Sequence, residues 1–412
     1  MASFMKNRGG KLPIIGAWAI AFLIISVILI STNYRSRDPD SALYSDMAAK
    51  MGTLPLKDFI APQWWGLWNN QGLFREHPIG FFIVPVLFIK LGLPANQACY
   101  LVNALYQILS LLLIYKLAQP FCAAMEARSL LWIIQLLPIS FAYRIRANHE
   151  QAVLLCLLLA LFGIERVRNR LSWVLCVASA LFGLMLIKGL FVFFGIAICF
   201  FWAIFRTPEI NQKSRLKPIW AMIVVIIFLG VVVVAYESIY FHTTGESFLK
   251  VYVGKWVGLG IGQHGSFLVN RMYHLVWYLA RILWFACPWS FLFLGLLWKY
   301  RKSLGRWFFS FRNSVQNMAL EGFVLSLGVV AIYVFVLSLS SHKADRYIFP
   351  AHFFTAAVGI VASLRIWPKW RCFVEKLDNH FAFFPALVWM LCCFSSLVGS
   401  LLHLPWVKIW TK

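Results

Sequence analysis

The first apolar block of the chain is followed closely by Asp38, Pro39 and Asp40. Pro39 favours an extended conformation for the residue before it, so Asp40 falls at the start of a helix. A carboxylate is favoured there because the first backbone N–H groups have no partner within the helix. Asp40 could therefore be only a helix cap, or it could be a general base presented at the end of the apolar block.

A second acidic segment separates two later apolar blocks and reads Arg144-Ile145-Arg146-Ala147-Asn148-His149-Glu150. Glu150 opens the next block, where it too could be only a cap. The segment is too short to belong to a solvated domain. Two arginines, a histidine and a glutamate this close together favour a functional site.

Further ionisable groups stand at the ends of apolar blocks. Arg75, Glu76 and His77 are consecutive, which is costly at the edge of hydrocarbon unless the groups are paired or used; the alternative is a cluster that reaches toward water. Lys343 and Arg346 could anchor the chain to lipid head groups, or they could clamp a phosphate, which arginine binds with two parallel hydrogen bonds.

The composition indicates where these groups must lie. Of 412 residues, 61% are hydrophobic and 13% charged, whereas soluble domains have about 25% charged residues. The apolar blocks are long enough to cross a hydrocarbon core of about 30 Å. The chain is therefore a polytopic membrane protein, which excludes a soluble enzyme, a disordered chain and a disulfide scaffold. We assign the net charge of +23 to membrane orientation and expect no nucleic acid partner.

We predict about eleven transmembrane helices in a single integral-membrane domain over residues 1–412, without a C-terminal soluble domain. The apolar block 79–93 is too short to span and is predicted to be interfacial or re-entrant. The predicted spans are 13–31, 98–117, 129–143, 151–165, 171–187, 189–205, 218–240, 275–298, 319–340, 347–365 and 381–402.

The basic residues predict the orientation. With the N-terminus inside, more than half of the Lys and Arg residues fall in short cytoplasmic connections, as the positive-inside rule requires. The two long loops, 32–97 and 241–274, then lie on the opposite side, where any chemistry is expected. The glycines at 258–265 indicate an irregular, mobile loop, and their context does not fit a nucleotide site. His264 within them is more typical of a surface residue than of a ligand.

Five segments resemble a known family in order and spacing. Pro39 to Tyr44 resembles a first-loop Pro-Asp-Glu-x-Arg-Tyr signature, and Phe74 to Pro78 a Phe-Glu-Lys-Pro segment. Arg146 to Leu155 resembles a second-loop acid before a Leu-rich span. Ile187-Lys188-Gly189 resembles Thr-Lys-Gly, and Lys343 to Pro350 resembles Lys-x-x-Arg-Tyr-x-x-Pro. The chain thus resembles the GT-C glycosyltransferases of the bacterial aminoarabinose-transferase and protein O-mannosyltransferase superfamily.

The resemblance implies an all-α, GT-C-like membrane bundle with two long periplasmic loops and juxtamembrane helices. It implies an inverting glycosyltransferase of the bacterial inner membrane, active on the periplasmic face. The donor would be a polyprenyl-phosphate-linked monosaccharide. The acceptor would be lipid A, a core or O-antigen sugar of lipopolysaccharide or another glycan, and less readily a protein.

The resemblance also assigns residues. Asp40 and Glu150 match the catalytic acids, and the donor-binding positions are Tyr44, His77, Arg146, Lys188, Lys343, Arg346 and Tyr347. Glu76 and His264 match positions that can hold a divalent metal, for which carboxylate and imidazole suit Zn²⁺. No nucleotide cofactor is needed, since the lipid phosphate is the leaving group. The chain departs from the family at Ser41, Leu43, His77 and Glu150, which changes two cations near the donor.

The alternative is a secondary transporter or a flippase for lipid-linked sugars. Transporters place ionisable groups near the middle of the membrane, at broken helices of repeated halves. Here the predicted midplane positions are apolar and the charges crowd one face, which favours the enzyme.

Overall fold

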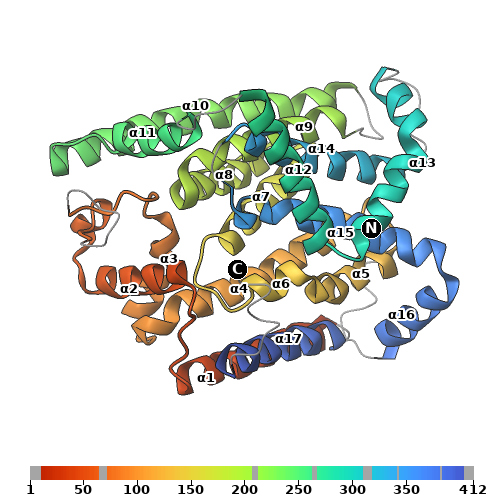
Figure 1. Ribbon diagram of the computed structural model, residues 1–412, viewed down its shortest axis with the longest axis horizontal. Coiled ribbons are helices and arrows are strands. Elements are labelled where there is room, and N and C mark those ends of the chain that lie inside the picture. Colours follow the sequence, from red (N-terminus) through yellow and green to blue (C-terminus); the bar gives the residue numbers. More distant parts are fainter. Residues whose placement is uncertain are drawn as a thin grey trace.

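The computed structural model describes residues 11–64, 72–206, 212–261, 267–309, 318–340, 343–380 and 383–402. These residues form helices joined by short connections, and their only β-type pairing is an isolated bridge between Gln63 and Leu73. The all-α prediction is confirmed. The α-helices (Figure 1) are α1 (Lys11–Ser31), α2 (Pro39–Thr53), α3 (Gly80–Lys90), α4 (Ala95–Ala118), α5 (Ala124–Ile133), α6 (Pro138–Tyr143), α7 (Glu150–Val167), α8 (Val174–Lys188), α9 (Val192–Phe205), α10 (Gln212–Thr244), α11 (Phe248–Ile261), α12 (Phe267–Phe285), α13 (Trp289–Phe309), α14 (Met318–Ser338), α15 (Phe349–Ile366), α16 (Pro368–His380) and α17 (Phe384–Leu401).

Short 3₁₀ turns join several of these helices and carry part of the site. They are η3 (Leu56–Ile60), η4 (Ile134–Leu136), η5 (Leu171–Trp173), η6 (Gly189–Phe191) and η7 (Asp345–Ile348).

Several helices are long and apolar enough to cross a membrane. Among the described residues, five helical stretches meet that test by length and composition, and a sixth does so if the bent pair α12 and α13 is taken as one. The shorter apolar helices include parts of α1 and α17 and all of α3. The chain is thus a multi-pass membrane protein, and the number of about eleven spans stays a prediction. The 11 residues of α3 agree with a segment too short to span.

The apolar stretch 171–205 folds back on itself at Gly189. A Cβ atom added to Gly195 on α9 would lie 2.7 Å from the Leu181 side chain on α8. These residues could approach so closely only if the two helices run side by side, because fourteen residues of straight helix extend about 21 Å. The positive φ of 50° at Gly189 permits the reversal. This agrees with two separate spans, as predicted for 171–187 and 189–205.

Two predicted spans are broken at prolines. The span predicted at 129–143 is divided into α5, η4 and α6, and Leu137 is extended immediately before Pro138. The span predicted at 275–298 is divided into α12 and α13, which meet at 119° around Pro288. Proline has no backbone N–H to continue a helix and disfavours helical conformation in the residue before it. A count of apolar residues does not detect these breaks.

The second long loop is more ordered than the sequence predicts. Residues 248–261 form α11, so Gly258 and Gly260 lie in a helix and the prediction of an irregular loop is wrong for that part. The rest of the glycine-rich stretch, including His264, lies outside the described residues. The first long loop contains α2, η3 and α3.

The helices differ in how deeply they are buried. Of the apolar membrane-span segment formed by η7 and α15, 83% is buried inside the protein, whereas of the segment in α10 only 22% is buried. The helix α15 is therefore central and α10 presents side chains to lipid. Near the ends of the chain, α1 packs beside α17 through Trp18 and Trp389, whose ring centroids are 6.3 Å apart (Figure 1).

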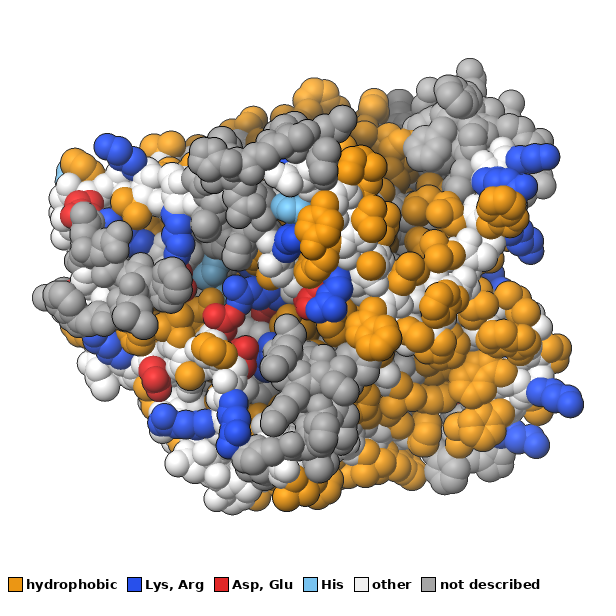
Figure 2. Space-filling view, viewed as in Figure 1, with side chains coloured by type: hydrophobic (Ala, Val, Ile, Leu, Met, Phe, Trp, Pro, Cys, Tyr) orange, Lys and Arg blue, Asp and Glu red, His pale blue; other side chains and the backbone are white. Residues whose placement is uncertain are grey.

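On the face that Figure 2 shows, most charged side chains lie from the left part to the middle of the molecule or at its right edge. Figure 2 shows acidic and basic side chains over the left part of the molecule, where α2, α3 and α11 lie in Figure 1. Lys and Arg side chains appear again at the right edge, near α13 and α16, and the surface between is largely hydrophobic. An apolar band between two polar ends is the pattern that a bilayer requires.

Candidate active site

The first turn of α2 holds Asp40 at the surface of the bundle. The cap of this helix is Asp38, whose carboxylate accepts a hydrogen bond from the backbone N–H of Ser41 at 3.1 Å. Asp40 is therefore not the cap that the sequence allowed. Its side chain is about one-third exposed and forms an ion pair with Arg346 of η7. This carboxylate is free of the capping role and can be reached from solvent.

Asp38 and Ser41 join the start of α2 to the segment before α7. The Arg146 guanidinium lies 3.3 Å from Asp38 Oδ1 and over the Tyr143 ring at 4.8 Å. The Ser41 hydroxyl donates to Asp38 at 2.7 Å and accepts from the backbone N–H of Ala147 at 3.0 Å. Arg146, predicted to bind donor, thus holds the two segments together, and Ser41 lies where the family has a glutamate.

Glu150 and Lys188 form a buried ion pair. The carboxylate is the first residue of α7 and the ammonium is the last residue of α8, with 3.1 Å between Glu150 Oε1 and Lys188 Nζ. Their side chains are 1% and 3% exposed. The sequence also allowed Glu150 to be only a helix cap, but its carboxylate forms an ion pair with the ammonium of Lys188. In this geometry the Glu150 carboxylate is shielded from water and holds the Lys188 ammonium.

An aromatic ring connects this buried pair to Asp40. Lys188 Nζ lies 5.2 Å from the centre of the Tyr347 ring and 4.5 Å from that of Phe191, and Arg346 lies 5.7 Å from the Tyr347 ring. Cations over ring faces are stabilised by the ring quadrupole. The polar network thus runs from Asp40 through Arg346, Tyr347 and Lys188 to Glu150. Five of the predicted site residues come together here from α2, η7, α8 and α7.

Tyr44, His149 and His77 form a buried cluster beside this network. Tyr44 is one helical turn after Asp40 on α2, and its ring lies 4.3 Å from His149, which lies 4.4 Å from His77. Burial, and then the positive charge of Lys188, holds the pKa of His77 well below its usual value. Burial, and then His77 and Lys188, does the same to the pKa of His149. Both imidazoles are therefore neutral at neutral pH. Burial, and then Glu76 and Glu150, raises the pKa of Tyr44.

Lys343 lies apart from the ion pairs of the network. Its ammonium is 4.0 Å from the Tyr273 ring and 6.0 Å from the Trp277 ring, both on α12. The nearby Asp345 of η7 accepts two hydrogen bonds of 2.5 Å from Arg281 of α12. Within the described residues Lys343 has no carboxylate partner, so its charge remains available to an anion.

Glu76, predicted as a metal ligand, forms an ion pair with Lys255 of α11 at 3.7 Å. Its predicted partner His264 lies outside the described residues. Within the part of the chain that the structure describes, no three His, Cys, Asp or Glu side chains are grouped closely enough to hold a metal ion. The metal site stays a prediction.

Arg75 joins the first long loop to α10 and the turn after it, a role that the sequence did not predict. Its guanidinium donates to Tyr240 at 3.1 Å and forms an ion pair with Glu246. The side chain is 7% exposed. The run Arg75-Glu76-His77 was recognised as costly unless its groups are paired, but the partners are more than 160 residues away along the chain.

Comparisons with known proteins bear on the fold of this chain. The family described as dolichyl-phosphate-mannose-protein mannosyltransferase matches residues 76–236. The crystal structure of ArnT from Cupriavidus metallidurans bound to undecaprenyl phosphate superposes with a TM-score of 0.64 at 14% identity, covering 94% of this chain and 76% of that one. This chain has the GT-C glycosyltransferase fold. The resemblance predicted from the five sequence segments is confirmed.

Two further solved structures show similarity to this chain. The apo crystal structure of the same ArnT gives a TM-score of 0.60 at 16% identity over 95% of this chain and 77% of that one. The archaeal oligosaccharyltransferase AglB from Archaeoglobus fulgidus is more distant, with a TM-score of 0.46 and 11% identity. A search of curated proteins gives no match.

Proposed function

We propose that this protein is an inverting glycosyltransferase that moves a monosaccharide from a polyprenyl-phosphate donor to a cell-envelope acceptor. The observation that carries the proposal is the partly exposed carboxylate of Asp40 beside Arg346, at one end of an apolar bundle with the GT-C fold. A carboxylate that can accept a proton and a cation that can hold a phosphate are the two groups that this transfer requires.

The proposed reaction gives each of these side chains a role. The acceptor hydroxyl attacks the anomeric carbon from the side opposite the phosphate and transfers its proton to Asp40. The bond between the anomeric carbon and the phosphate oxygen breaks, and polyprenyl phosphate leaves with the electron pair. Arg346 and Lys343 stabilise the developing negative charge, which is usually the larger catalytic contribution.

The ion pair between Asp40 and Arg346 fits the state before donor binds. A donor phosphate would take over Arg346 by the paired hydrogen bonds that arginine makes with phosphate. Asp40 would then lose its ion-pair partner, and its carboxylate would be free to accept the proton of the acceptor hydroxyl. Donor binding would thus activate the base.

The tail of the donor requires no separate soluble site. An isoprenoid chain can lie against the apolar helices while its phosphate remains at the end of the bundle, near η7. We extend the proposal to the periplasmic face of a bacterial inner membrane, with the N-terminus cytoplasmic, because this orientation puts most short basic connections inside. The acceptor class is a glycolipid such as lipid A, a lipopolysaccharide sugar or another glycan.

The proposed reaction requires no step at a metal. Glu76 is held by Lys255, and a pair of protein ligands makes a weak zinc site, since structural Zn²⁺ takes four and catalytic Zn²⁺ usually three. A Zn²⁺ ion between Glu76 and His264 would join the two long loops and leave the chemistry to Asp40. Elemental analysis of active protein tests whether a metal is bound there. If the active protein contains no stoichiometric metal and chelators do not affect it, the metal site is contradicted.

The test of the function is a reconstituted assay. Purified protein is placed in vesicles made from the total lipids of the source cells, which contain their own lipid-linked sugars, and covalent products are followed by mass spectrometry. We expect a glycosylated acceptor and free polyprenyl phosphate. The Asp40→Asn variant should be slower by about 10²–10⁴-fold, while Asp46→Asn, altered on the exposed side of the same helix, should retain activity.

The transporter alternative predicts a different outcome of the same assay. A flippase would move lipid-linked sugar across sealed vesicles without forming a covalent product. Flux without product, or an active Asp40→Asn variant, would contradict the proposal.

A further inference from the structure

A cavity lies toward the other end of the bundle from Asp40. It has a volume of about 420 Å³ and is enclosed by side chains from α4, α5, α7, α9, α13, α14 and α15. This volume is within the range of about 300–1,000 Å³ that is typical of small-molecule sites. Its walls include Leu158, Phe323 and Phe353, and most of the other lining side chains are also apolar.

The position of this cavity separates it from the proposed donor site. The helix α15 starts at Phe349, three residues after Arg346. The residues of α15 that line the cavity lie between Phe353 and Ile366. From Phe349 to Arg365 a helix rises about 24 Å, which is most of the thickness of a hydrocarbon core. A lipid whose phosphate sits at the far end of this cavity therefore belongs to the leaflet opposite the donor phosphate.

The cavity reaches the surface of the bundle. Its lining includes the exposed residues Gly295 and Lys299 of α13 and Ile366 of α15. Large hydrophobic side chains beside them are also exposed, among them Phe291 at 61% and Trp298 at 70%. Exposed apolar side chains around an opening indicate that the opening faces lipid hydrocarbon rather than water.

The polar groups of the lining suit an anion. The lining residues include two cations, Lys299 and Arg365, and no carboxylate. Lys299 has no carboxylate partner among the described residues, and its ammonium lies 5.5 Å from the Tyr300 ring.

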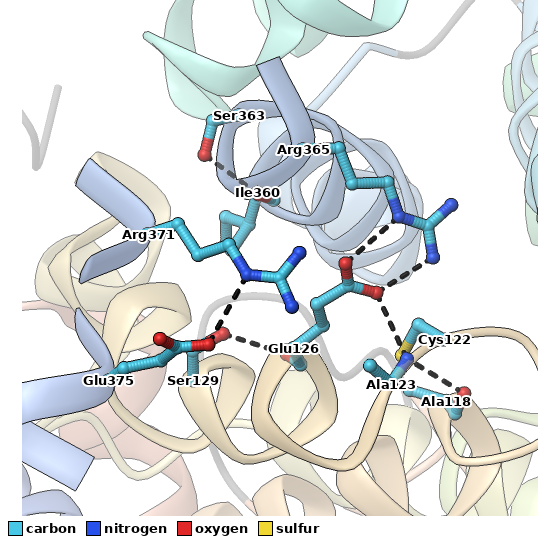
Figure 3. Close-up of polar contacts among 10 residues, drawn as sticks. All are labelled: Ala118, Cys122, Ala123, Glu126, Ser129, Ile360, Ser363, Arg365, Arg371 and Glu375. Carbon is cyan, nitrogen blue, oxygen red and sulfur yellow. Dashed lines mark hydrogen bonds and ion pairs between the residues drawn. The ribbon is translucent and has the colours of Figure 1, made fainter. Parts of the chain in front are cut away.

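Arg365 leaves one edge of its guanidinium open. Glu126 is 2% exposed and accepts from Arg365 Nε and Nη2 at 3.0 and 2.7 Å. Its carboxylate also accepts from the backbone N–H of Ala123 at 3.0 Å. The remaining nitrogen, Nη1, points away from Glu126 in Figure 3. The carboxylate thus orients the guanidinium without covering this nitrogen.

The height of these cations matches that of a lipid head group. Trp298 precedes Lys299, and the Arg301 guanidinium stacks on its ring at 3.8 Å. Trp367, which is 49% exposed, follows Arg365 by two positions. Exposed tryptophans with basic residues are characteristic of the boundary between hydrocarbon and head groups. The apolar cavity lies on the hydrocarbon side of this boundary, and the two cations lie at the boundary. Together they are complementary to a molecule that has a hydrocarbon chain and an anionic head group.

We propose that this cavity binds an anionic phospholipid, with one acyl chain between α13, α14 and α15 and the phosphate held by Lys299 and Arg365. Basic pockets between transmembrane helices bind anionic lipid head groups in this way. The inference is independent of the proposed function, because the site lies at the opposite end of the bundle from Asp40 and uses none of the residues assigned to transfer.

Two variants alter the cavity at different points. Gly295 lines the cavity at its opening, and a Cβ atom there would have no neighbouring atom within 4 Å, so Gly295→Leu adds a bulky side chain at the entry of the acyl chain without a direct clash. Gly230 of α10 has equally open surroundings and is not part of the lining, so Gly230→Leu is a matched control. Lys299→Ala removes a cation from an exposed position, where the fold should tolerate the change.

The experiment measures lipid that remains bound after purification. Protein is purified in detergent, and its co-purified lipids are extracted and quantified by mass spectrometry per mole of protein. Native protein and Gly230→Leu should retain an anionic glycerophospholipid at near stoichiometric amount. Lys299→Ala should retain about fivefold less, the effect of one basic residue near a membrane surface, and Gly295→Leu should retain less still.

Two results would overturn the proposal. One is equal retention of anionic phospholipid by native protein, Gly295→Leu and Lys299→Ala. The other is a retained lipid of another class, such as a polyprenyl phosphate or a neutral phospholipid, that these two variants lose. Melting temperatures with and without added anionic phospholipid complete the test, since binding to the folded state must raise the melting temperature of native protein.

Discussion

At the scale of single residues, Glu150 and Asp40 differ in a way that separates their roles. Glu150 is almost fully buried on Lys188, whereas Asp40 is about one-third exposed beside Arg346. A group that exchanges a proton with an acceptor must be reachable, which only Asp40 is here. Glu150 instead fixes a cation whose ammonium lies against Tyr347. We therefore propose that Asp40 transfers the proton and that Glu150 has a positioning role.

The buried pair gives a stability prediction. Lys188→Met should lower the free energy of unfolding by about 3–5 kcal/mol, because it leaves a buried carboxylate without its partner. The double variant Glu150→Gln with Lys188→Met should recover much of that loss while remaining inactive, since the ammonium of Lys188 is then missing from the site beside Tyr347. Denaturation of the purified variants measures this. Arg35→Met, which removes an exposed pair with Asp46 at 4.0 Å, should cost about 0–1 kcal/mol. A double variant no more stable than Lys188→Met would contradict the assignment.

The neutral histidines predict a pH dependence of stability. The pKa values of His77 and His149 are held well below their usual value in the folded state, whereas in the unfolded chain they are about 6.5. Below about pH 6.5 the unfolded state binds more protons than the folded state. The stability contributed by the neutral histidines is therefore fully present above this pH and is lost as the pH falls. The expected loss is up to about 1.4 kcal/mol per pH unit for each histidine.

Melting temperatures between about pH 8 and about pH 5 test this. The fall below about pH 6.5 should be shallower when both residues are changed, as His77→Gln with His149→Gln, than in native protein. His242→Gln, altered at an exposed residue of α10, should leave the slope unchanged. An identical slope in the double variant and native protein would show that these rings do not carry the effect.

At the scale of elements, the end of α8 determines where Lys188 points. Gly189 has a positive φ, and a Cβ atom there would lie 2.3 Å from Tyr252 Oη of α11. Tyr252 cannot turn away without loss, because its hydroxyl donates to the carbonyl of Lys188 at 3.2 Å. The turn between α8 and α9 therefore tolerates glycine only.

Gly189→Ala should be strongly destabilising. The left-handed conformation costs a residue with a side chain about 1–2 kcal/mol, and overpacking against Tyr252 adds about 1–3 kcal/mol. Gly92→Ala is the control, since Gly92 also has a positive φ but open surroundings, so it should show only the first cost. Thermal melting of both variants checks the difference, and equal losses would mean that Tyr252 moves aside freely.

Long apolar segments were predictable from the sequence, and breaks within them were not. The helices α4, α7, α14 and α15 begin and end within a few residues of the predicted spans, because charges and prolines bound their apolar stretches. The breaks at Pro138 and Pro288 were missed because the composition stays apolar across them. The helix α11 was missed because its glycines were interpreted as a loop, whereas tertiary packing overrides weak propensity.

The candidate site was predictable as a set of residues but not as a set of pairs. The sequence placed Asp40, Glu150, Lys188 and Arg346 at one end of the bundle, since all lie at the ends of apolar segments. It could not show that Asp40 pairs with Arg346 and Glu150 with Lys188, because those partners are distant along the chain and only packing of the helices selects them. The sequence also could not show that Asp38, and not Asp40, caps α2, because this depends on the backbone conformation at the start of the helix.

At the scale of the whole molecule, the ends of the bundle should face different compartments. Asp46 is exposed on α2, the helix that also carries Asp40, and Cys372 on α16 is exposed. We expect an Asp46→Cys variant to react with a membrane-impermeant maleimide in intact spheroplasts, and the native Cys372 to react only after permeabilisation. Mass spectrometry of peptides identifies the labelled cysteine, so native protein serves as control. Labelling of Cys372 alone in intact spheroplasts would reverse the proposed orientation.

The central claim is that this bundle adds a sugar to an envelope molecule through Asp40. Mass spectrometry of envelope glycolipids and glycans, from cells with and without the gene, tests it most directly. We predict that one component loses the mass of a single sugar unit when the gene is absent. Native protein and Asp46→Asn should restore that mass, and Asp40→Asn should not. An unchanged envelope in cells without the gene, or full restoration by Asp40→Asn, would contradict the account.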